Sequence, residues 1–410
     1  MLEKTQNTAK AVAPVVGFIL ILAILFLAAG QYQANVVPVE ERSAEIDHFS
    51  GVSEDISGLR SSIIQSSTSG EIQTQEIDLG VTYGVLGLSQ PPRSGSLTYI
   101  NRSEEIEIRN AQNNREASNF WRGDVNRSYE TGFLQYEISY NRVNDHADIY
   151  LEHGLMYRDT ARGTDEVVNF LAESDQQIIN GRSITLYTLQ SDMGTVSRVG
   201  TSTVETNPTS APMNSISLTN VEDDSPIEIQ LPTRLSVEDW EDILENEKRE
   251  NNDDGYINNI RAGEESETIV LELEEDETYN LQMSRIDLST QGQSTVTPFT
   301  EEQYIAVDRE TANVREDSNI QLDAEVRDKY NNGVIGVEVE VEAQDANQQC
   351  IGDFTGTTTT SENTNCNNDG DYRQPGIDIS SSDGSVTYEY NAPEIETDRD
   401  VTFIYRMDSE

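Results

Sequence analysis

The sequence AVAPVVGFILILAILFLAAG at residues 11–30 decides how the rest of the chain is placed. There is no charged side chain between Lys10 and Glu40. About 20 predominantly apolar residues in a helix span the hydrocarbon layer of a bilayer. We therefore expect a transmembrane helix over residues 11–33, in contact with the lipid bilayer. A cleaved secretory signal is the alternative, because residues 28–30 are small and resemble a cleavage site.

The charges that flank this segment predict its orientation. Lys4 and Lys10 precede it, whereas the first basic residue after it, Arg42, follows two glutamates. Basic residues next to a membrane span favour the cytoplasmic side. We expect residues 1–10 to be a cytoplasmic leader and the C-terminal ectodomain to be extracellular.

The composition is strongly acidic. The 410 residues include 27 Lys and Arg against 75 Asp and Glu, which gives a formal net charge of −48. Such a charge opposes compaction at low ionic strength, but in molar salt the Debye length falls to about 3 Å and the repulsion is screened. The composition therefore indicates a halophilic protein; an acidic disordered chain is the alternative. It also argues against a nucleic-acid partner, because phosphate binding needs clustered Lys and Arg.

A second helical pattern follows at residues 39–68. Its apolar side chains recur every three or four residues, which is the spacing of one helix face. They are Ile46, Phe49, Val52, Ile56, Leu59 and Ile63. We expect a stalk helix whose apolar face packs either against another chain, as in a coiled coil, or against a β-domain of its own chain.

The apolar spacing changes to two from residue 72, which predicts a central β-rich ectodomain over residues 70–290. Alternating apolar and polar side chains are typical of half-buried strands. The strand-like stretches are 77–83, 96–100, 104–109, 133–140, 147–157, 184–189, 215–218, 226–231, 268–273 and 278–286. Short strands with polar turns favour an antiparallel sandwich or barrel. One helix is expected around Trp240, with Ser236 as N-cap and Asp239 three residues on.

A polar stretch at residues 291–303 is typical of a linker, and a last domain is expected over residues 304–410. Its strand-like stretches are 304–307, 319–327, 337–343, 385–390 and 401–405. The region has roughly the length of an Ig domain, and Asp383-Gly384 predicts a hairpin turn. The predicted fold class is mainly β: an N-terminal transmembrane helix, a stalk helix, a sandwich-like ectodomain and a C-terminal Ig-like β-sandwich.

Two kinds of covalent feature are expected outside the membrane. Cys350 and Cys366 are the only cysteines, and fifteen residues of polar, loop-like sequence separate them. A cysteine pair beyond a membrane span favours a disulfide, with about 3 kcal/mol of stabilisation from loop entropy; two free thiols are the alternative. Asn101 and Asn126 begin sequons and are candidate N-glycosylation sites. A third sequon, at Asn207, is excluded by the proline that follows it.

The sequence shows no local signature of catalysis or metal binding. The histidines are His48, His146 and His153, and the last two would lie on opposite faces of one strand. Carboxylates recur throughout, so that no pair stands out as general acid and base. The loop at residues 250–255 could hold Ca²⁺, but it lacks the spacing of a dedicated site. We predict no catalytic residue, no metal ligand and no cofactor; an extracellular enzyme without a recognisable motif is an alternative.

The N-terminal sequence carries a resemblance. Residues 10–18 read KAVAPVVGF, which is similar to the start of haloarchaeal type IV pilins and pilin-like proteins, where a basic leader and a cleavage pair precede a V-S-P-V-[IV]-G helix. Ala13 replaces the usual Ser. The resemblance implies cleavage by a prepilin-type peptidase after Ala11, which would leave Val12 first. The continuation QYQANVVP at residues 31–38 is similar to uncharacterised haloarchaeal membrane proteins with long ectodomains.

Two stretches near the C-terminus carry another resemblance. Residues 326–337 read VRDKYNNGVIGV, and residues 382–388 read SDGSVTY. They resemble the D-x-x-x-N-P-V-x-G-V turn and the D-G-x-[VA] stretch of Ig-like domains of the invasin and intimin type, with Gly333 in place of Pro. The resemblance implies a rigid spacer or adhesion module. The stretch between the two cysteines departs from that family's pattern as an insertion.

Together these observations predict a structural or adhesion protein, anchored by one pass in the cell membrane of a halophilic archaeon and exposed at its surface. Besides the bilayer, surface-layer or other cell-surface proteins are the expected partners. A pilin-like minor subunit of a type IV filament, processed after Ala11, is the alternative. Its ectodomain would be several times larger than the head of a typical archaeal pilin.

Overall fold

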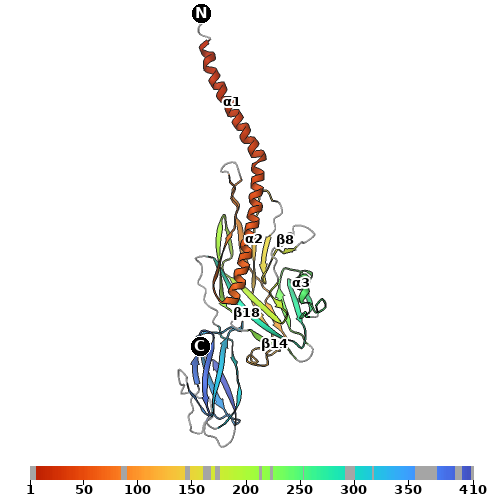
Figure 1. Cartoon of the computed structure of the whole chain (residues 1–410), viewed down its shortest axis with the longest axis vertical. Coiled ribbons are helices and arrows are strands. Elements are labelled where there is room, and N and C mark those ends of the chain that lie inside the picture. The colour runs from red at the N-terminus through yellow and green to blue at the C-terminus, as the bar shows by residue number, and fades with distance from the viewer. Residues whose placement is uncertain are drawn as a thin grey trace.

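The computed structural model shows an elongated molecule with its N-terminal helices at one end and a small β-domain at the other (Figure 1). The described residues are 6–84, 90–143, 148–159, 168–170, 176–211, 215–221, 225–252, 254–290, 301–315, 318–355, 376–392 and 399–407. Among the described residues, strands account for 47% and helices for 20%. The predicted mainly β fold class is therefore confirmed.

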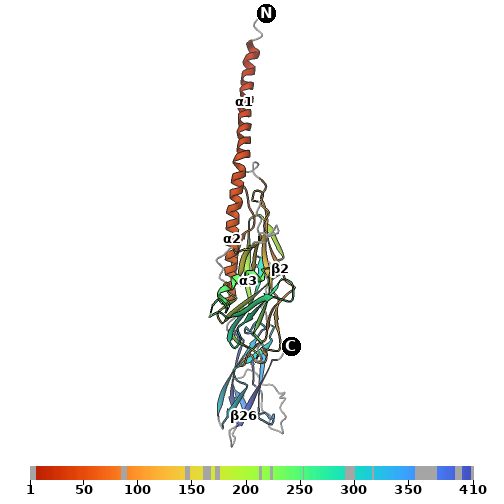
Figure 2. The same ribbon diagram turned by 90° about the vertical axis from the view of Figure 1, so that its right-hand side faces the viewer.

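Two helices form an N-terminal rod. Helix α1 covers Gln6–Asn35 and helix α2 covers Val37–Ser69; Figure 2 shows them following one another along one side of the molecule. The break between them lies at Val36, two residues before Pro38. Proline has no amide hydrogen to offer the carbonyl one turn earlier, which explains a kink here. The rod ends at Gly70, whose φ of 69° forms the C-cap.

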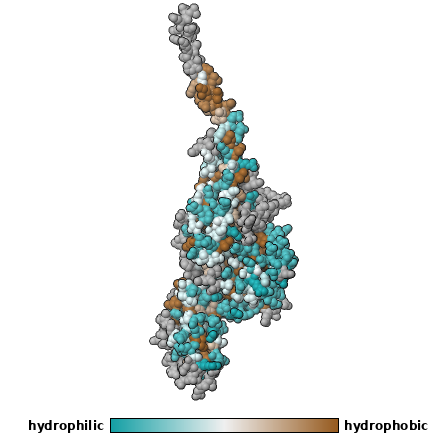
Figure 3. Space-filling model, viewed as in Figure 1, coloured by the Kyte–Doolittle hydropathy of each residue, from teal (hydrophilic) through white to brown (hydrophobic). Residues whose placement is uncertain are grey.

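The apolar side chains of α1 are exposed. The most apolar part of α1 is 0% buried. In the described chain, this N-terminal helical rod is the one place that is long and apolar enough to cross a membrane. Figure 3 shows hydrophobic surface gathered on α1, above domains that are largely hydrophilic. The other large hydrophobic residues that are exposed away from the two helices in the described chain are Ile72, Val199, Ile335 and Ile379.

Helix α2 packs on the central domain, residues 70–290, with the apolar face that the sequence predicts. The buried members of this face are Val52, Ile56, Leu59 and Ile63. They cover strands β1 (Gln73–Asp78), β13 (Thr201–Ser210) and β18 (Thr278–Thr290). Of the two predicted roles for the helix, packing on its own β-domain is thus the one observed for these residues. Ile46 differs, because half of its surface is exposed.

The sheet beneath α2 has seven strands. Its order is β1, β13, β18, β11 (Ser183–Ser191) and β10 (Ile179–Asn180), and β14 (Ile216–Asn220) and β4 (Ala111–Gln112) extend it beside β18. Strands β11 and β18 run parallel. The expectation of a purely antiparallel domain is therefore wrong at this pair. The chain between β11 and β18 is long enough for the crossover that parallel strands require.

Two further sheets complete the central domain. The six-stranded sheet has the order β12 (Thr195–Arg198), β2 (Gly95–Asn101), β6 (Gly132–Glu137), β7 (Asp148–Glu152), β8 (Leu155–Asp159) and β9 (Val168–Phe170). The five-stranded sheet has the order β16 (Ile257–Ala262), β17 (Thr268–Leu273), β15 (Glu228–Pro232), β3 (Ile106–Arg109) and β5 (Arg127–Tyr129). The long strand β18 serves two cores, with Leu281 in one and Ile286 in the other.

The predicted helix near Trp240 is present as α3 (Val237–Ile243), which a one-turn 3₁₀ helix, η1 (Glu245–Glu247), follows. Ser236 accepts the amide of Asp239 at 3.2 Å, and the Asp239 carboxylate accepts the amide of Ser236 at 2.9 Å. This reciprocal pair is a capping box. Trp240 is fully buried, so the helix is fixed at its start by capping and at its centre by packing.

The C-terminal domain, residues 304–407, consists of two four-stranded antiparallel sheets. One has the order β19 (Tyr304–Val307), β21 (Asn319–Arg327), β25 (Ser385–Asn391) and β23 (Asp353–Thr355). The other has the order β20 (Thr311–Val314), β26 (Arg399–Met407), β22 (Glu338–Gln344) and β24 (Gly376–Ile379). Leu322 and Tyr388 of the first sheet meet Val341 of the second in a core of their own.

Two local predictions are wrong. Residues 147–157 do not form one strand: β7 and β8 make a hairpin around His153-Gly154, with φ of 48° and 73°. A tight two-residue turn needs these positive values, so His153 lies in the turn; His146 is outside the described residues. The turn at Asp383-Gly384 is present, but it connects β24 and β25, which belong to different sheets and are not a hairpin.

Candidate functional site

The predicted covalent sites lie at exposed or loop positions. Cys350 is disulfide-bonded, and its predicted partner Cys366 is outside the described residues. Asn101 ends β2 in the six-stranded sheet, and Asn126 directly precedes β5 in the five-stranded sheet. Both asparagines are exposed, so each sequon presents its acceptor to solvent.

The other predicted sites have no arrangement specialised for chemistry. The predicted cleavage position, between Ala11 and Val12, lies inside α1, which begins at Gln6. The loop at residues 250–255, the candidate for Ca²⁺ binding, folds back on η1. Asn252 donates its side-chain amide to the carbonyl of Asn246 at 2.9 Å. Within the described residues, no group of three His, Cys, Asp or Glu side chains is placed to hold a metal ion.

Two buried glutamates of α2 fasten the helix to the central domain. We call Glu41, Glu45 and the groups that donate to them the helix clamp. Glu45 is fully buried, and its carboxylate accepts the Tyr83 hydroxyl at 2.7 Å and the amides of residues 141–143 at 2.7–2.8 Å. Glu41 accepts the amide of Gln90 at 2.7 Å. Buried carboxylates are stable only when such donors surround them.

A histidine extends this fastening along α2. His48 Nδ1 lies 2.7 Å from the Tyr140 hydroxyl, and its Nε2 lies 3.1 Å from the carbonyl of Asp78. Burial lowers the pKa of His48 from its usual range, so the imidazole is neutral at pH 7 and can accept as well as donate. The N-terminal half of α2 is therefore joined by polar contacts to the loops before β2 and after β6. Its C-terminal half is joined to the central domain by apolar packing.

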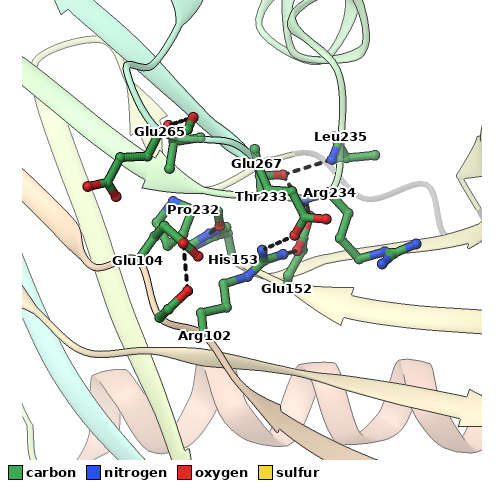
Figure 4. A network of polar contacts seen from close by, with 12 residues as sticks. Arg102, Glu104, Glu152, His153, Pro232, Thr233, Arg234, Leu235, Glu265 and Glu267 are labelled. Carbon is green, nitrogen blue, oxygen red and sulfur yellow. Dashed lines mark hydrogen bonds and ion pairs between the residues drawn. The ribbon is translucent and has the colours of Figure 1, made fainter.

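A buried ionic cluster surrounds Glu152 at the end of β7 (Figure 4). The side chains of Arg102 and Glu152 are 3% and 1% exposed and form a salt bridge. Glu152 also accepts the hydroxyls of Tyr157 at 3.1 Å and Thr233 at 2.7 Å. His153 Nε2 lies 2.7 Å from the carbonyl of Pro232, and burial lowers the pKa of this imidazole.

The position of the cluster explains what it does. Arg102 follows β2 and Glu152 ends β7, both of the six-stranded sheet, whereas Thr233 follows β15 of the five-stranded sheet. The cluster thus cross-links two layers of the central domain. Catalysis by a carboxylate or imidazole needs access to a substrate, but Glu152 and His153 are 1% and 7% exposed. The geometry is that of a structural ion pair whose charges are matched by hydrogen bonds.

A turn of the C-terminal domain, residues 328–332, is inserted against the central domain; we call this contact the interdomain joint. Asp328 organises the turn, because its Oδ1 accepts the amides of Tyr330 at 2.8 Å and Asn332 at 3.0 Å. Asn331 has a φ of 69°, a conformation that asparagine tolerates better than most residues. Asp328, Tyr330, Asn331 and Asn332 are all at most 4% exposed.

Residues of the central domain complete the joint. Trp121 donates its indole N–H to Oδ1 of Asn331 at 2.8 Å, and Asn332 donates to the carbonyl of Met283 at 3.0 Å. Phe120 stacks on Tyr304, with ring centroids 4.6 Å apart. Buried hydrogen bonds and aromatic packing of this kind restrict the orientation of the two domains.

The edge of the C-terminal domain is covered beside the joint. Val307 of β19 donates its amide to the carbonyl of Glu116 at 3.0 Å, and the Asn119 side chain donates to the carbonyl of Ile305 at 3.1 Å. These bonds use the backbone groups that an edge strand otherwise leaves open. A hollow of about 410 Å³ remains between the loop that contains Asn119 and strand β26. It is lined by Phe120, Tyr405 and their neighbours.

Comparisons with known proteins cover a small part of the chain. No protein-family model and no solved structure matches it. An uncharacterized protein of Archaeoglobus fulgidus is 34% identical over 87 residues. This match covers 21% of the chain and 15% of the relative's length. Part of the chain therefore resembles an archaeal protein.

Proposed function

We propose that this protein is a single-pass, membrane-anchored surface protein of a halophilic archaeon, which holds its acidic β-rich ectodomain outside the cell to support or contact other surface proteins. One observation carries the proposal: the exposed apolar helix α1 continues into α2, and α2 is fixed to the central domain. A helix that is apolar on all sides suits a bilayer, and the fixed helix would transmit the anchoring to the domains.

The interdomain joint supports a role in presentation. The C-terminal domain lies at the end opposite α1 (Figure 1) and is held there by buried contacts of Asp328 and Asn331 with the central domain. Such an arrangement would keep the last domain at a fixed distance from the membrane. The net charge of −48 would keep it soluble at high salt.

Cysteine labelling in intact cells tests the orientation. Val199, 45% exposed on the ectodomain, is replaced by Cys in one variant, and Lys4 of the leader in another; Cys350 is already disulfide-bonded. We expect a membrane-impermeant maleimide to label Val199→Cys in intact cells and Lys4→Cys only after lysis. Both proteins should stay in the membrane after an alkaline wash. The reverse labelling, or release by the wash, would contradict the proposal.

The sequence KAVAPVVGF gives a reason to consider a pilin-like subunit as the second candidate. It lies in α1, and most of the side chains of α1 from Val15 onward are exposed and available to neighbouring helices. Mass spectrometry of the native N-terminus separates the two candidates. A chain that begins at Val12 and is recovered with sheared filaments would favour the filament subunit, whereas a chain that keeps Lys10 and stays in the membrane would favour the anchor.

A further inference from the structure

Helix α2 has a second apolar stripe, on the side that the central domain leaves open. Val39 and Ile46 are 67% and 50% exposed, and the exposed serines Ser43 and Ser50 alternate with them. We call these four residues the outer face. At about 100° per residue, the outer face lies roughly 150° around the helix from the buried side chains Glu41, Glu45 and Val52.

Exposed apolar side chains are rare elsewhere on this acidic ectodomain. In the described chain, those away from the helices are Ile72, Val199, Ile335 and Ile379. The outer face instead continues the exposed apolar surface of α1 beyond the membrane span, because Val36 and Val39 follow directly. Exposed apolar side chains that follow one another along one face of a helix indicate a contact with another protein.

The charges beside the stripe indicate which protein. The spacing of Val39, Ser43, Ile46 and Ser50 is four, three and four, the spacing of seam positions in a coiled coil. Arg42 then lies on one flank and Asp47, five residues later, on the other. In a parallel pair of such helices, these flanking positions meet across the seam. Arg42 and Asp47 are both exposed, and neither has an ion-pair partner in the part of the chain that the structure describes.

We propose that two copies of this chain associate through the outer face as a parallel, two-fold symmetric pair, with Val39 and Ile46 in the seam and Arg42 of each copy beside Asp47 of the other. The serines between the apolar residues would allow a close approach. The seam contains only two apolar residues of each copy, so it is suited to two helices that the membrane already holds parallel. The domains of the two copies would hang on opposite sides, because each occupies the far face of its own α2.

The inference rests on the anchored topology of the proposed function. Two chains in one bilayer point the same way and lie at the same depth, so Ile46 of one copy faces Ile46 of the other without a search for register. Helix α2 is already folded against its domain, and no helix nucleation opposes the association. Confinement to the membrane raises the effective concentration of the partner helix. A pilin-type filament differs, because its contacts join unlike faces of successive subunits.

Disulfide cross-linking of the full-length protein in native membranes tests the seam. The variant Ile46→Cys should form covalent dimers under mild oxidation, because a two-fold axis brings the same position of both copies together. The matched control is Val199→Cys, which replaces a similarly exposed apolar residue, 45% exposed, on the connection between β12 and β13. Cross-linking of Ile46→Cys at the rate of the control would overturn the pair.

Charge reversal in the Ile46→Cys background tests the flanks. Arg42→Asp should lower the dimer yield by about four-fold, since each of the two symmetric ion pairs contributes about two-fold. The double variant R42D/D47R should restore the yield, and failure to restore it would overturn the proposed pairing. Membrane retention is measured in the same samples. Protein that stays in the membrane without cross-linking would reject the pair and leave the anchor standing, whereas soluble protein would reject both.

Discussion

Ser210, the last residue of β13, donates its hydroxyl to the carboxylate of Asp328 at 2.7 Å and so joins the central domain to the C-terminal domain. Asn332 donates its side-chain amide to the same Ser210 oxygen at 2.7 Å. All three side chains are buried. Because the two domains share buried hydrogen bonds as well as a covalent linker, we expect their stabilities to be coupled.

The carboxylate of Asp328 should make this coupling depend on pH. Burial raises the pKa of Asp328 to about 6, although Ser210 and two backbone amides act in the opposite direction. The stability associated with its protonation is complete below the unfolded pKa of 3.8 and is lost as the pH rises through about 6. Ionised Asp328 therefore costs about 3 kcal/mol at pH 8. Asparagine cannot ionise, but its amide nitrogen no longer accepts the Ser210 hydroxyl. We therefore expect Asp328→Asn to be more stable than the native protein at pH 8, by less than this amount.

Urea unfolding followed by Trp fluorescence at pH 4 to 8 measures the difference, since Trp121 lies in the joint. The advantage of Asp328→Asn should shrink toward zero as the pH falls to 4. Asp192→Asn removes an exposed carboxylate and serves as the control, with no advantage expected at either pH. A constant difference for Asp328→Asn across this range would contradict the assignment.

The helix clamp gives a second prediction, for Glu45→Gln. The carboxylate of Glu45 accepts the amides of residues 141–143 and the Tyr83 hydroxyl. A glutamine amide turns one acceptor into a donor that faces other donors, so we expect a loss of about 2 kcal/mol. Hydrogen exchange should become faster at residues 141–143. Glu54→Gln, at an exposed position of the same helix, should leave exchange there unchanged.

Elements with a local pattern of apolar or capping residues could be predicted from the sequence. The α2 face with Val52 and Ile56, the strand at residues 319–327 and the capping box of Ser236 all carry local periodicity or local polar chemistry. Strand β13 does not. Its inward side chains Ser202 and Thr206 are small and polar yet buried. Thr206 can be buried because its hydroxyl has a hydrogen-bond partner, Oγ of Ser66 in α2, at 2.7 Å. No hydrophobic pattern marks such a strand.

The joint and the clamp could not be predicted for a different reason. The turn at residues 328–332 was recognisable as a turn, but its partners Trp121 and Ser210 are far away in the sequence. Glu45 is one of several glutamates in an acidic helix, and only its contacts with residues 141–143 explain its burial. Pairings over such distances depend on the packing of whole sheets, which a single sequence does not reveal.

The ionic cluster predicts a large loss of stability for Arg102→Met. The variant would leave Glu152 charged and without its ion-pair partner in a site that is 1% exposed. Removing one partner of a buried pair typically costs about 3–5 kcal/mol. Arg122→Met is the control, because Arg122 and Asp124 form an exposed pair at 3.5 Å that is worth less than about 1 kcal/mol. Chemical unfolding compares the two, and equal losses would contradict a structural role for the cluster.

The two exposed sequons predict N-glycans on protein from its native membrane. Asn101→Gln and Asn126→Gln should each lower the intact mass by one glycan. Asn207→Gln should leave the glycan mass unchanged, because a proline follows Asn207. Glycosylation takes place outside the cytoplasm, so a glycan at either site would also place the central domain outside. If cysteine labelling shows that domain to be outside while both asparagines are unmodified, these sequons are unused, and the anchored topology would rest on the labelling alone.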